Sequence, residues 1–196
     1  MKKTLIFGLM AIIALSAFTS MHVDQYKVDT ESSVITWKAG KINGSTHEGT
    51  IQLSEGIIRI DHGKVAGGNF TADMESIKVT DIEGKYAEKL EGHLASEDFF
   101  NVAEFKQSKF TIGSVSKNED GTFKVLGIMT IKGIKKPLRF NAQLSFTDNS
   151  VSMSGTALVN RTEYDIKYGS AQFFSDLGDR AIKDEFELNF NIVANK

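Results

Sequence analysis

Histidines are the side chains best suited to acid–base or metal chemistry in this sequence. The chain has four of them, at positions 22, 47, 62 and 93. None lies at the i, i+4 spacing of a helical zinc site, and none belongs to a cluster with cysteine. His47 or His93 could act as a general acid or base if the fold brought a carboxylate to it. A surface histidine that only forms hydrogen bonds is the alternative interpretation.

A lysine cluster surrounds Gly133, just before the only proline of the chain, Pro137. Lys132, Lys135 and Lys136 could steer an acidic head group toward the protein, or they could form a solvated hairpin. The sequence has no Gly-x-Ser-x-Gly nucleophile elbow, P-loop or dinucleotide fingerprint. Its aspartates and asparagines are too dispersed for an EF-hand-like calcium loop. We therefore predict no catalytic residue and no metal site.

Composition narrows the range of partners. The 196 residues include no cysteine, which excludes a disulfide framework, thiol catalysis and a lipid-modified cysteine. The net charge at pH 7 is −2 and both signs are mixed along the chain, so there is no basic footprint for nucleic acid. No apolar stretch after residue 20 is long enough to cross a membrane. We predict neither nucleic-acid binding nor stable membrane insertion.

Residues 1–20 have the order of a secretory signal peptide. Lys2 and Lys3 provide a positive start, and an unbroken run of apolar and small residues extends from Leu5 to Ala17. This run is shorter than the ~20 residues that a membrane-spanning helix needs. We predict that residues 1–20 are cleaved and that residues 21–196 form one domain in the periplasm or outside the cell. A retained N-terminal anchor is the alternative.

Alternation of apolar and polar residues dominates the rest of the chain. Phe140, Ala142 and Leu144, for example, are separated from one another by single polar residues. Because successive side chains of a strand point to opposite faces, each such segment has one apolar and one wet face. This pattern is typical of an antiparallel sheet that is covered on one side.

One segment, at about residues 86–96, breaks the alternation and predicts a short helix. Leu90 and Leu94 lie four residues apart, on one helical face. About eight strands with one helix predict an all-β fold, either a sandwich or a closed antiparallel barrel. An eight-stranded barrel can be filled by its own side chains or hold one small ligand. Periodicity alone favours the packed core, because cavities cost stability.

Two segments carry recognisable motifs, HLASEDFFNV from His93 to Val102 and GIMTIKGIKKP from Gly127 to Pro137. They resemble the HLxSxDFFDV segment and the GxLTIxGxTKP hairpin of the YceI-like, polyisoprenoid-binding family. The strand around Trp37, the His47–Gly49 pair and residues 161–166 are similar to further family elements. The order and spacing of these pieces are specific, and they extend from about Tyr26 to the C-terminus.

The sequence departs from the family pattern at a few positions that we expect in turns and at edges. Asn101 replaces an aspartate, Lys135 a threonine and Asp165 a glycine, and Lys106 stands where a proline is usual. The resemblance implies a lipocalin-like, eight-stranded antiparallel barrel with an apolar tunnel for an isoprenoid chain, often in a homodimer. It shifts the expectation from a packed interior to one that holds an isoprenoid or isoprenoid quinone, with no other cofactor.

Inward-facing strand positions would line such a tunnel, and the helix carrying Leu90 and Leu94 would close one end. The candidate ligand-binding residues are Trp37, Phe70, Met74, Phe110, Phe140, Ala142, Leu144, Met153, Tyr164, Phe186 and Phe190. Ala142 would leave room for the ligand, so Ala142→Trp is expected to block the tunnel. The predicted function is sequestration or transport of an apolar ligand, without catalysis. A ligand-free, stress-related interaction module and a lipid-acting enzyme are the alternatives.

Overall fold

The computed structural model describes residues 23–196, and the predicted signal peptide lies outside this part of the chain. No helix within residues 23–196 is long and apolar enough to span a membrane. The elements are β1 (Val23–Val28), β2 (Val34–Gly40), β3 (Thr46–Asp61), β4 (Lys64–Val79), α1 (Gly84–Ala95), β5 (Gln107–Lys117), β6 (Phe123–Ile131), β7 (Ile134–Phe146), β8 (Ser150–Asn160), η1 (Arg161–Tyr164), η2 (Gly178–Arg180) and β9 (Glu185–Asn195).

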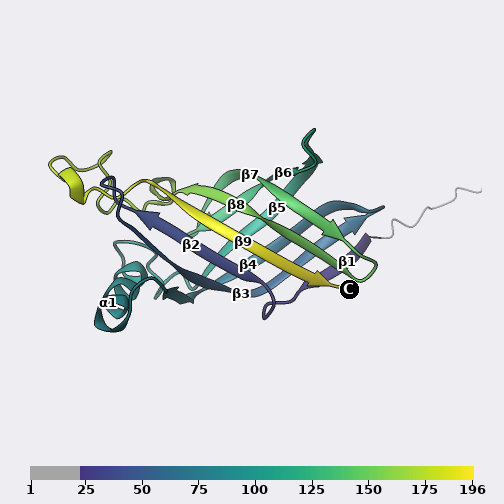
Figure 1. Cartoon of the computed structure of the whole chain (residues 1–196), viewed down its shortest axis with the longest axis horizontal. Helices are drawn as coiled ribbons and strands as arrows, with labels where there is room; N and C mark the ends of the chain where they lie inside the picture. Colours follow the sequence, from purple (N-terminus) through teal and green to yellow (C-terminus); the bar gives the residue numbers. More distant parts are fainter. Residues whose placement is uncertain (1–22) are drawn as a thin grey trace, which may run out of the picture.

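The strands close into an antiparallel barrel with eight strand positions (Figure 1). From β3 to β9 each strand pairs with the next, and β2 closes the ring by pairing with both β9 and β3. β1 shares the position of β2, because β1 pairs with residues 57–61 of β3 and β2 with residues 46–51. The predicted eight-stranded barrel with one short helix is therefore confirmed, and the helix spans 84–95 rather than about 86–96.

Asp29 ends β1 and separates it from β2. Its carboxylate accepts hydrogen bonds from the backbone N–H groups of Glu31 and Ser32 and from the Ser32 hydroxyl. These bonds, those from Ser32 foremost, hold the pKa of Asp29 below its usual value. A side chain that satisfies backbone donors two and three residues ahead favours a turn over a continued strand, so one strand position is filled by two short strands.

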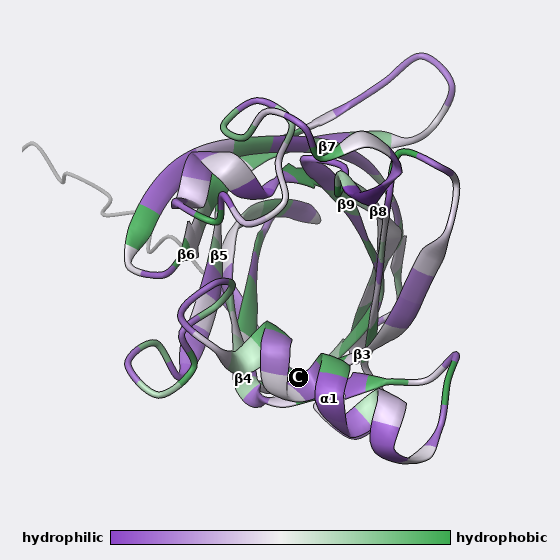
Figure 2. Ribbon diagram, turned by 90° about the vertical axis from the view of Figure 1, so that its left-hand side faces the viewer, coloured by the Kyte–Doolittle hydropathy of each residue, from purple (hydrophilic) through white to green (hydrophobic). Residues whose placement is uncertain are grey.

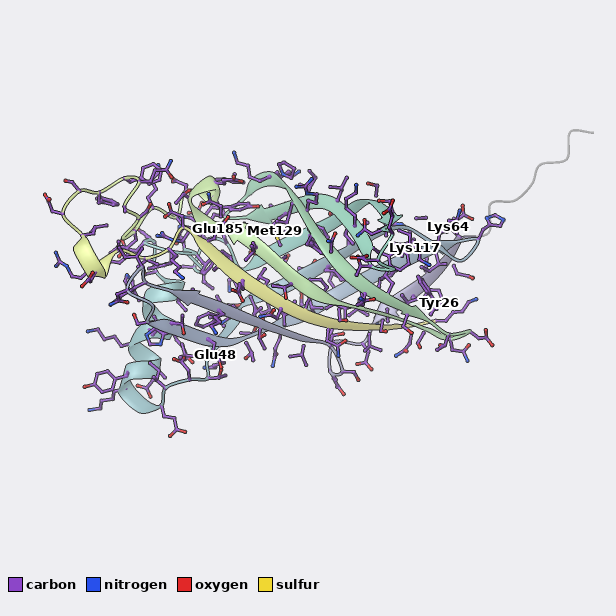
Figure 3. All side chains as sticks on the ribbon, turned by 45° about the horizontal axis from the view of Figure 1, so that its top comes forward. Tyr26, Glu48, Lys64, Lys117, Met129 and Glu185 are labelled. Atoms are coloured by element: carbon purple, nitrogen blue, oxygen red, sulfur yellow. The ribbon has the colours of Figure 1, made fainter. Side chains whose placement is uncertain are left out.

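The two ends of the barrel differ. The α1 end carries α1, the loop 96–106, the hairpin between β6 and β7, and the segment 161–184. Figure 2 looks into this end and shows α1 across one side of the ring, next to β3 and β4. Tyr26, Lys64 and Lys117 lie toward the opposite end (Figure 3). The helix and these long connecting segments therefore all lie at one end of the barrel.

Side chains fill the half of the barrel far from α1. The rings of Phe110 and Phe140 lie 5.3 Å apart and those of Phe140 and Phe190 lie 5.2 Å apart, between ring centroids. Around them pack the buried side chains of Tyr26, Val28, Ile58, Ile60, Ile112, Val125, Ala142, Val151, Met153 and Ile192. This half has the close packing of an ordinary protein core.

Glycines opposite aromatic residues make room for rings in both halves of the barrel. The directly paired residues are Trp37 with Gly49, Phe70 with Gly56, and Phe190 with Gly155. A Cβ atom on Gly155 would lie 3.0 Å from Cζ of Phe190 and 2.7 Å from the backbone oxygen of Asn141. The space left by Gly155 is thus occupied by the Phe190 ring.

Candidate ligand-binding cavity

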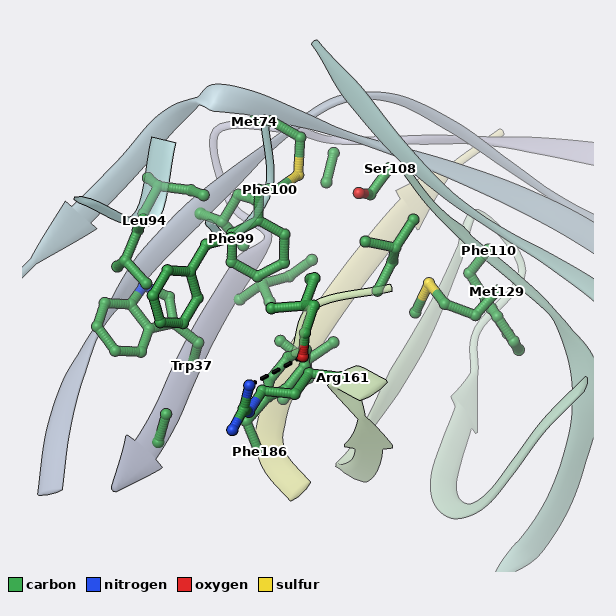
Figure 4. Close-up of a pocket in the computed structure, with 18 of the residues that line it drawn as sticks. Trp37, Met74, Leu94, Phe99, Phe100, Ser108, Phe110, Met129, Arg161 and Phe186 are labelled. Carbon is green, nitrogen blue, oxygen red and sulfur yellow. Dashed lines mark hydrogen bonds between the residues drawn. The ribbon is translucent and has the colours of Figure 1, made fainter. Parts of the chain in front are cut away.

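A cavity of about 150 Å³ lies inside the barrel at the α1 end (Figure 4). Its wall includes apolar side chains from β2, β4, β6 and β9, among them Trp37, Met74, Met129 and Phe186. Leu94, from the last turn of α1, contributes to the wall on the side of the helix. Phe70 and Phe110 line the cavity and also belong to the packed core, so they form its floor.

The structure divides the candidate ligand-binding residues into two groups. Those that line the cavity are Trp37, Phe70, Met74, Phe110 and Phe186. Those that belong to the packed half of the barrel are Phe140, Ala142, Leu144, Met153 and Phe190. Alternation correctly indicates which side chains point inward, but it does not indicate how deep in the barrel they lie.

Tyr164 lies in neither group. It is 2% exposed and packs with Phe99, Ile131, Val159 and Ile166 in a separate cluster near η1. Burial raises the pKa of its phenol to about 12, with a further contribution from Glu163. Tyr164 therefore supports the wall from behind as a neutral side chain.

Several lining residues were not among the candidates because they lie outside the strands. Phe99 and Phe100 follow α1, and Ile166 and Ile182 belong to the segment between β8 and β9. Strand periodicity does not select such positions. The aromatic pair within HLASEDFFNV is the signal that could have found two of them.

Arg161 holds the segment between β8 and β9 against the barrel. Its guanidinium donates to the backbone oxygens of Lys183, Ile166, Tyr168 and Ile182, at 2.8–3.1 Å, and to Asp184 Oδ1 at 3.4 Å. Burial lowers the pKa of this guanidinium and Asp184 partly offsets the effect, but arginine remains charged in proteins. Arg161 is 4% exposed and also lines the cavity, so it links the cavity wall to the chain that covers it.

The two histidines considered for acid–base chemistry do have carboxylate partners. His47 Nδ1 lies 2.8 Å from Asp81 Oδ2, and His93 Nε2 lies 3.2 Å from Asp98 Oδ2. Burial alone would raise the pKa of Asp81, but hydrogen bonds from His47 and the Glu48 backbone outweigh it and lower the pKa.

Both histidines lie outside the cavity. They line an open groove between α1 and the β2–β3 hairpin, together with Lys41, Tyr86 and Lys89. Among residues 23–196, no group of histidine, aspartate and glutamate side chains is arranged to hold a metal ion.

The lysine cluster forms part of the hairpin between β6 and β7. Lys132 and Gly133 occupy the turn, both with positive φ, and Lys135 is exposed. Lys132 Nζ donates to the backbone oxygen of Asp165 at 3.4 Å. The cluster therefore contributes one hydrogen bond between the hairpin and the segment 161–184, which Arg161 holds against the barrel.

A family model for the YceI-like domain matches residues 26–194. The chain belongs to the YceI-like family. It is 32% identical over 144 residues to a UPF0312 protein of Pseudomonas fluorescens, which covers 72% of each chain. It is 30% identical over 146 residues to protein YceI of Escherichia coli O157:H7, which covers 74% of this chain and 73% of that protein.

Solved structures support the same fold for this YceI-like domain. BcnA of Burkholderia cenocepacia matches with a TM-score of 0.68 at 20% identity, covering 85% of this chain and 99% of BcnA. A polyisoprenoid-binding domain of Saccharophagus degradans matches with a TM-score of 0.60 at 12% identity, covering 87% of this chain and 97% of that domain.

The YceI-like motifs meet around the cavity although they are far apart in the sequence. HLASEDFFNV supplies Leu94, Phe99 and Phe100, and GIMTIKGIKKP supplies Met129 and Ile131. The element at 161–166 supplies Arg161 and Ile166. The motifs that carry the family resemblance therefore build the α1 end of the barrel.

Proposed function

We propose that this YceI-like domain binds an apolar ligand of isoprenoid or similar lipid chemistry in the cavity at the α1 end, and sequesters or transports it. The observation that carries the proposal is an interior cavity of about 150 Å³ with an almost entirely apolar wall. An engineered apolar cavity of similar size in another protein stays empty of water and binds benzene.

Family membership supports a binding protein rather than an enzyme, and one similar structure is a polyisoprenoid-binding domain. Burying each methylene group stabilises a complex by roughly 0.8 kcal/mol. One five-carbon isoprene unit therefore contributes about 3–4 kcal/mol on the same scale. Apolar contact alone is sufficient to retain such a ligand, so the site needs few polar groups.

A long isoprenoid chain requires the α1 end to open. Pockets for drug-sized ligands measure about 300–1,000 Å³, whereas this cavity measures about 150 Å³. Leu94, Phe99 and Phe100 line the cavity and belong to a helix and a loop rather than to the barrel strands. We infer that these three side chains move outward when a long ligand enters.

We also propose that the protein is exported from the cytoplasm and sequesters or transports its ligand outside it. The pattern of residues 1–20 supports a signal peptide, and a carrier for an apolar molecule is needed wherever that molecule must cross water. Cell fractionation of the full chain should place a shortened protein outside the cytoplasm. Recovery of the uncleaved chain in the cytoplasm would contradict this part of the proposal.

A matched pair of substitutions tests the binding site itself. Ala72 lines the cavity, whereas Ala142 is 2% exposed within the packed half. Ala72→Phe should fill the cavity and abolish uptake of a radiolabelled isoprenoid alcohol, with little loss of stability. Ala142→Phe should lower the free energy of unfolding by about 1–3 kcal/mol through overpacking, yet retain uptake while folded. We therefore propose Ala72, rather than Ala142, as the position at which a bulky side chain blocks the site.

Uptake should be measured by equilibrium dialysis on both folded variants, with urea unfolding as the check on stability. Loss of uptake in Ala142→Phe but not in Ala72→Phe would contradict the proposed site.

A further inference from the structure

The position of Trp37 at the α1 end of the cavity is fixed by the residues around it. It lies on β2 directly opposite Gly49 of β3. A Cβ atom on Gly49 would lie 2.6 Å from Cζ2 and 2.7 Å from Cε2 of the indole. The absence of a side chain at Gly49 thus lets the indole rest on the backbone of β3. Figure 4 shows the indole beside Leu94 and Phe99, across the cavity from Ser108 and Phe110.

The indole nitrogen of Trp37 has no hydrogen-bond partner. The residue is 8% exposed, and Nε1 is the one buried side-chain nitrogen or oxygen between residues 23 and 196 that lacks a partner. Buried tryptophan N–H groups normally find an acceptor, and leaving such a donor unsatisfied is costly. An unpaired donor in the wall of a ligand cavity points to an acceptor that arrives with the ligand.

The Ser108 hydroxyl on the opposite wall is the rival donor, but Ser108 is only half-buried, and the remaining polar groups of the wall offer no free buried donor. All the nitrogens of the Arg161 guanidinium already donate to backbone oxygens or to Asp184. Lys109 and Lys183 are exposed to solvent. A water molecule is a poor partner for Nε1, because a buried water needs two to four polar neighbours and the side chains beside the indole are apolar.

We propose that Trp37 is a specificity-determining residue that donates a hydrogen bond from Nε1 to an oxygen of the ligand. The preferred ligand is then an apolar molecule that bears a carbonyl or ether oxygen, rather than a pure hydrocarbon. The oxygen lies under Leu94 and Phe99, and the apolar body extends toward Phe110 and Met129. Movement of Leu94 as the ligand enters opens the path to Nε1. This inference rests on the proposed function and adds the chemistry of one ligand atom.

Two ligands that differ in one atom group test the inference. The probes are the terpenoid ketone geranylacetone and the hydrocarbon in which a methylene group replaces its carbonyl group. Calorimetric titration should show that the wild-type protein binds the ketone about 10-fold more tightly, the effect of one hydrogen bond to a donor that is otherwise unsatisfied. Trp37→Phe should remove this preference. Ser108→Ala, on the opposite wall, should keep it.

A second measurement needs no variant. Trp37 is the only tryptophan in the chain, so the ¹⁵N-labelled protein gives a single indole N–H cross-peak. The ketone should move the indole proton downfield, as hydrogen bonding does, and the hydrocarbon should not.

The outcomes separate this inference from the proposed function. Binding of neither probe would contradict the proposed function and this inference with it. Equal binding of both probes, with the same indole shift, would contradict only the role of Trp37. A preference that is lost in Ser108→Ala and kept in Trp37→Phe would assign the hydrogen bond to Ser108 and overturn the inference.

Discussion

At the scale of single residues, glycines decide where aromatic rings can lie inside this barrel. Gly49 illustrates the constraint most sharply, because a Cβ atom there would also clash with the backbone oxygen of Lys78. No rotation of a side chain can relieve a contact with backbone, so β3 and β4 would have to separate. Gly49 therefore determines both the distance between β3 and β4 and the position of the Trp37 indole.

Gly49→Ala is expected to lower the free energy of unfolding by about 3 kcal/mol, the upper range for overpacking. Gly92→Ala is the matched control, because Gly92 lies in α1 and a Cβ atom there would meet nothing within 4 Å. This control should raise the stability by about 0.5–1 kcal/mol, since alanine favours helix. Urea unfolding of both variants checks the prediction. A Gly49→Ala protein as stable as wild type would contradict the packing described here.

At the scale of elements, the Glu91 carboxylate joins α1 to the barrel in addition to the apolar contacts of Ala87, Leu90 and Leu94. Glu91 Oε1 accepts the backbone N–H of Val79 at 3.0 Å, and Oε2 accepts from Lys78 Nζ at 3.2 Å. The bond from Val79 is the main cause that holds the pKa of Glu91 below its usual value, and Lys78 assists. The Glu91 carboxylate thereby joins the end of β4 to α1.

The attachment of α1 should depend on pH. A carboxyl group whose pKa is lower in the folded protein stabilises that state above its unfolded pKa, here 4.5. This stabilisation is lost as the pH falls through the lower folded value. Hydrogen exchange should therefore show better protection of α1 in wild type than in Glu91→Gln near pH 7, with the difference vanishing in acid. Strands β8 and β9 serve as the internal control. A pH-independent difference would contradict this role for Glu91.

Sequence patterns predict the elements better than they predict the site. Alternation identified β7, β8 and β9, and the spacing of Leu90 and Leu94 identified α1. The break between β1 and β2 depends on hydrogen bonds of the Asp29 side chain, which periodicity does not register. Alternation assigns Phe140 and Phe186 to the same interior, although the first is in the core and the second lines the cavity.

At the scale of the whole molecule, the two halves of the barrel differ in how their interiors are filled. The half far from α1 is a closed core, and the half next to α1 encloses the cavity and carries the family motifs. That difference follows from which rings meet, such as Phe110, Phe140 and Phe190, and so from three-dimensional neighbours rather than from spacing in the chain. We therefore expect that only the α1 half receives a ligand.

The methionine methyl groups can report directly which half of the barrel receives a ligand. Met74 and Met129 line the cavity, whereas Met153 is 3% exposed in the packed half. The measurement is a titration of geranylacetone into protein labelled with ¹³C at the methionine methyl groups, with assignment by methionine-to-leucine substitution. The methyl signals of Met74 and Met129 should shift while that of Met153 stays in place. A shift of Met153 equal to the others, or no shift at any of the three, would contradict a ligand site confined to the α1 end.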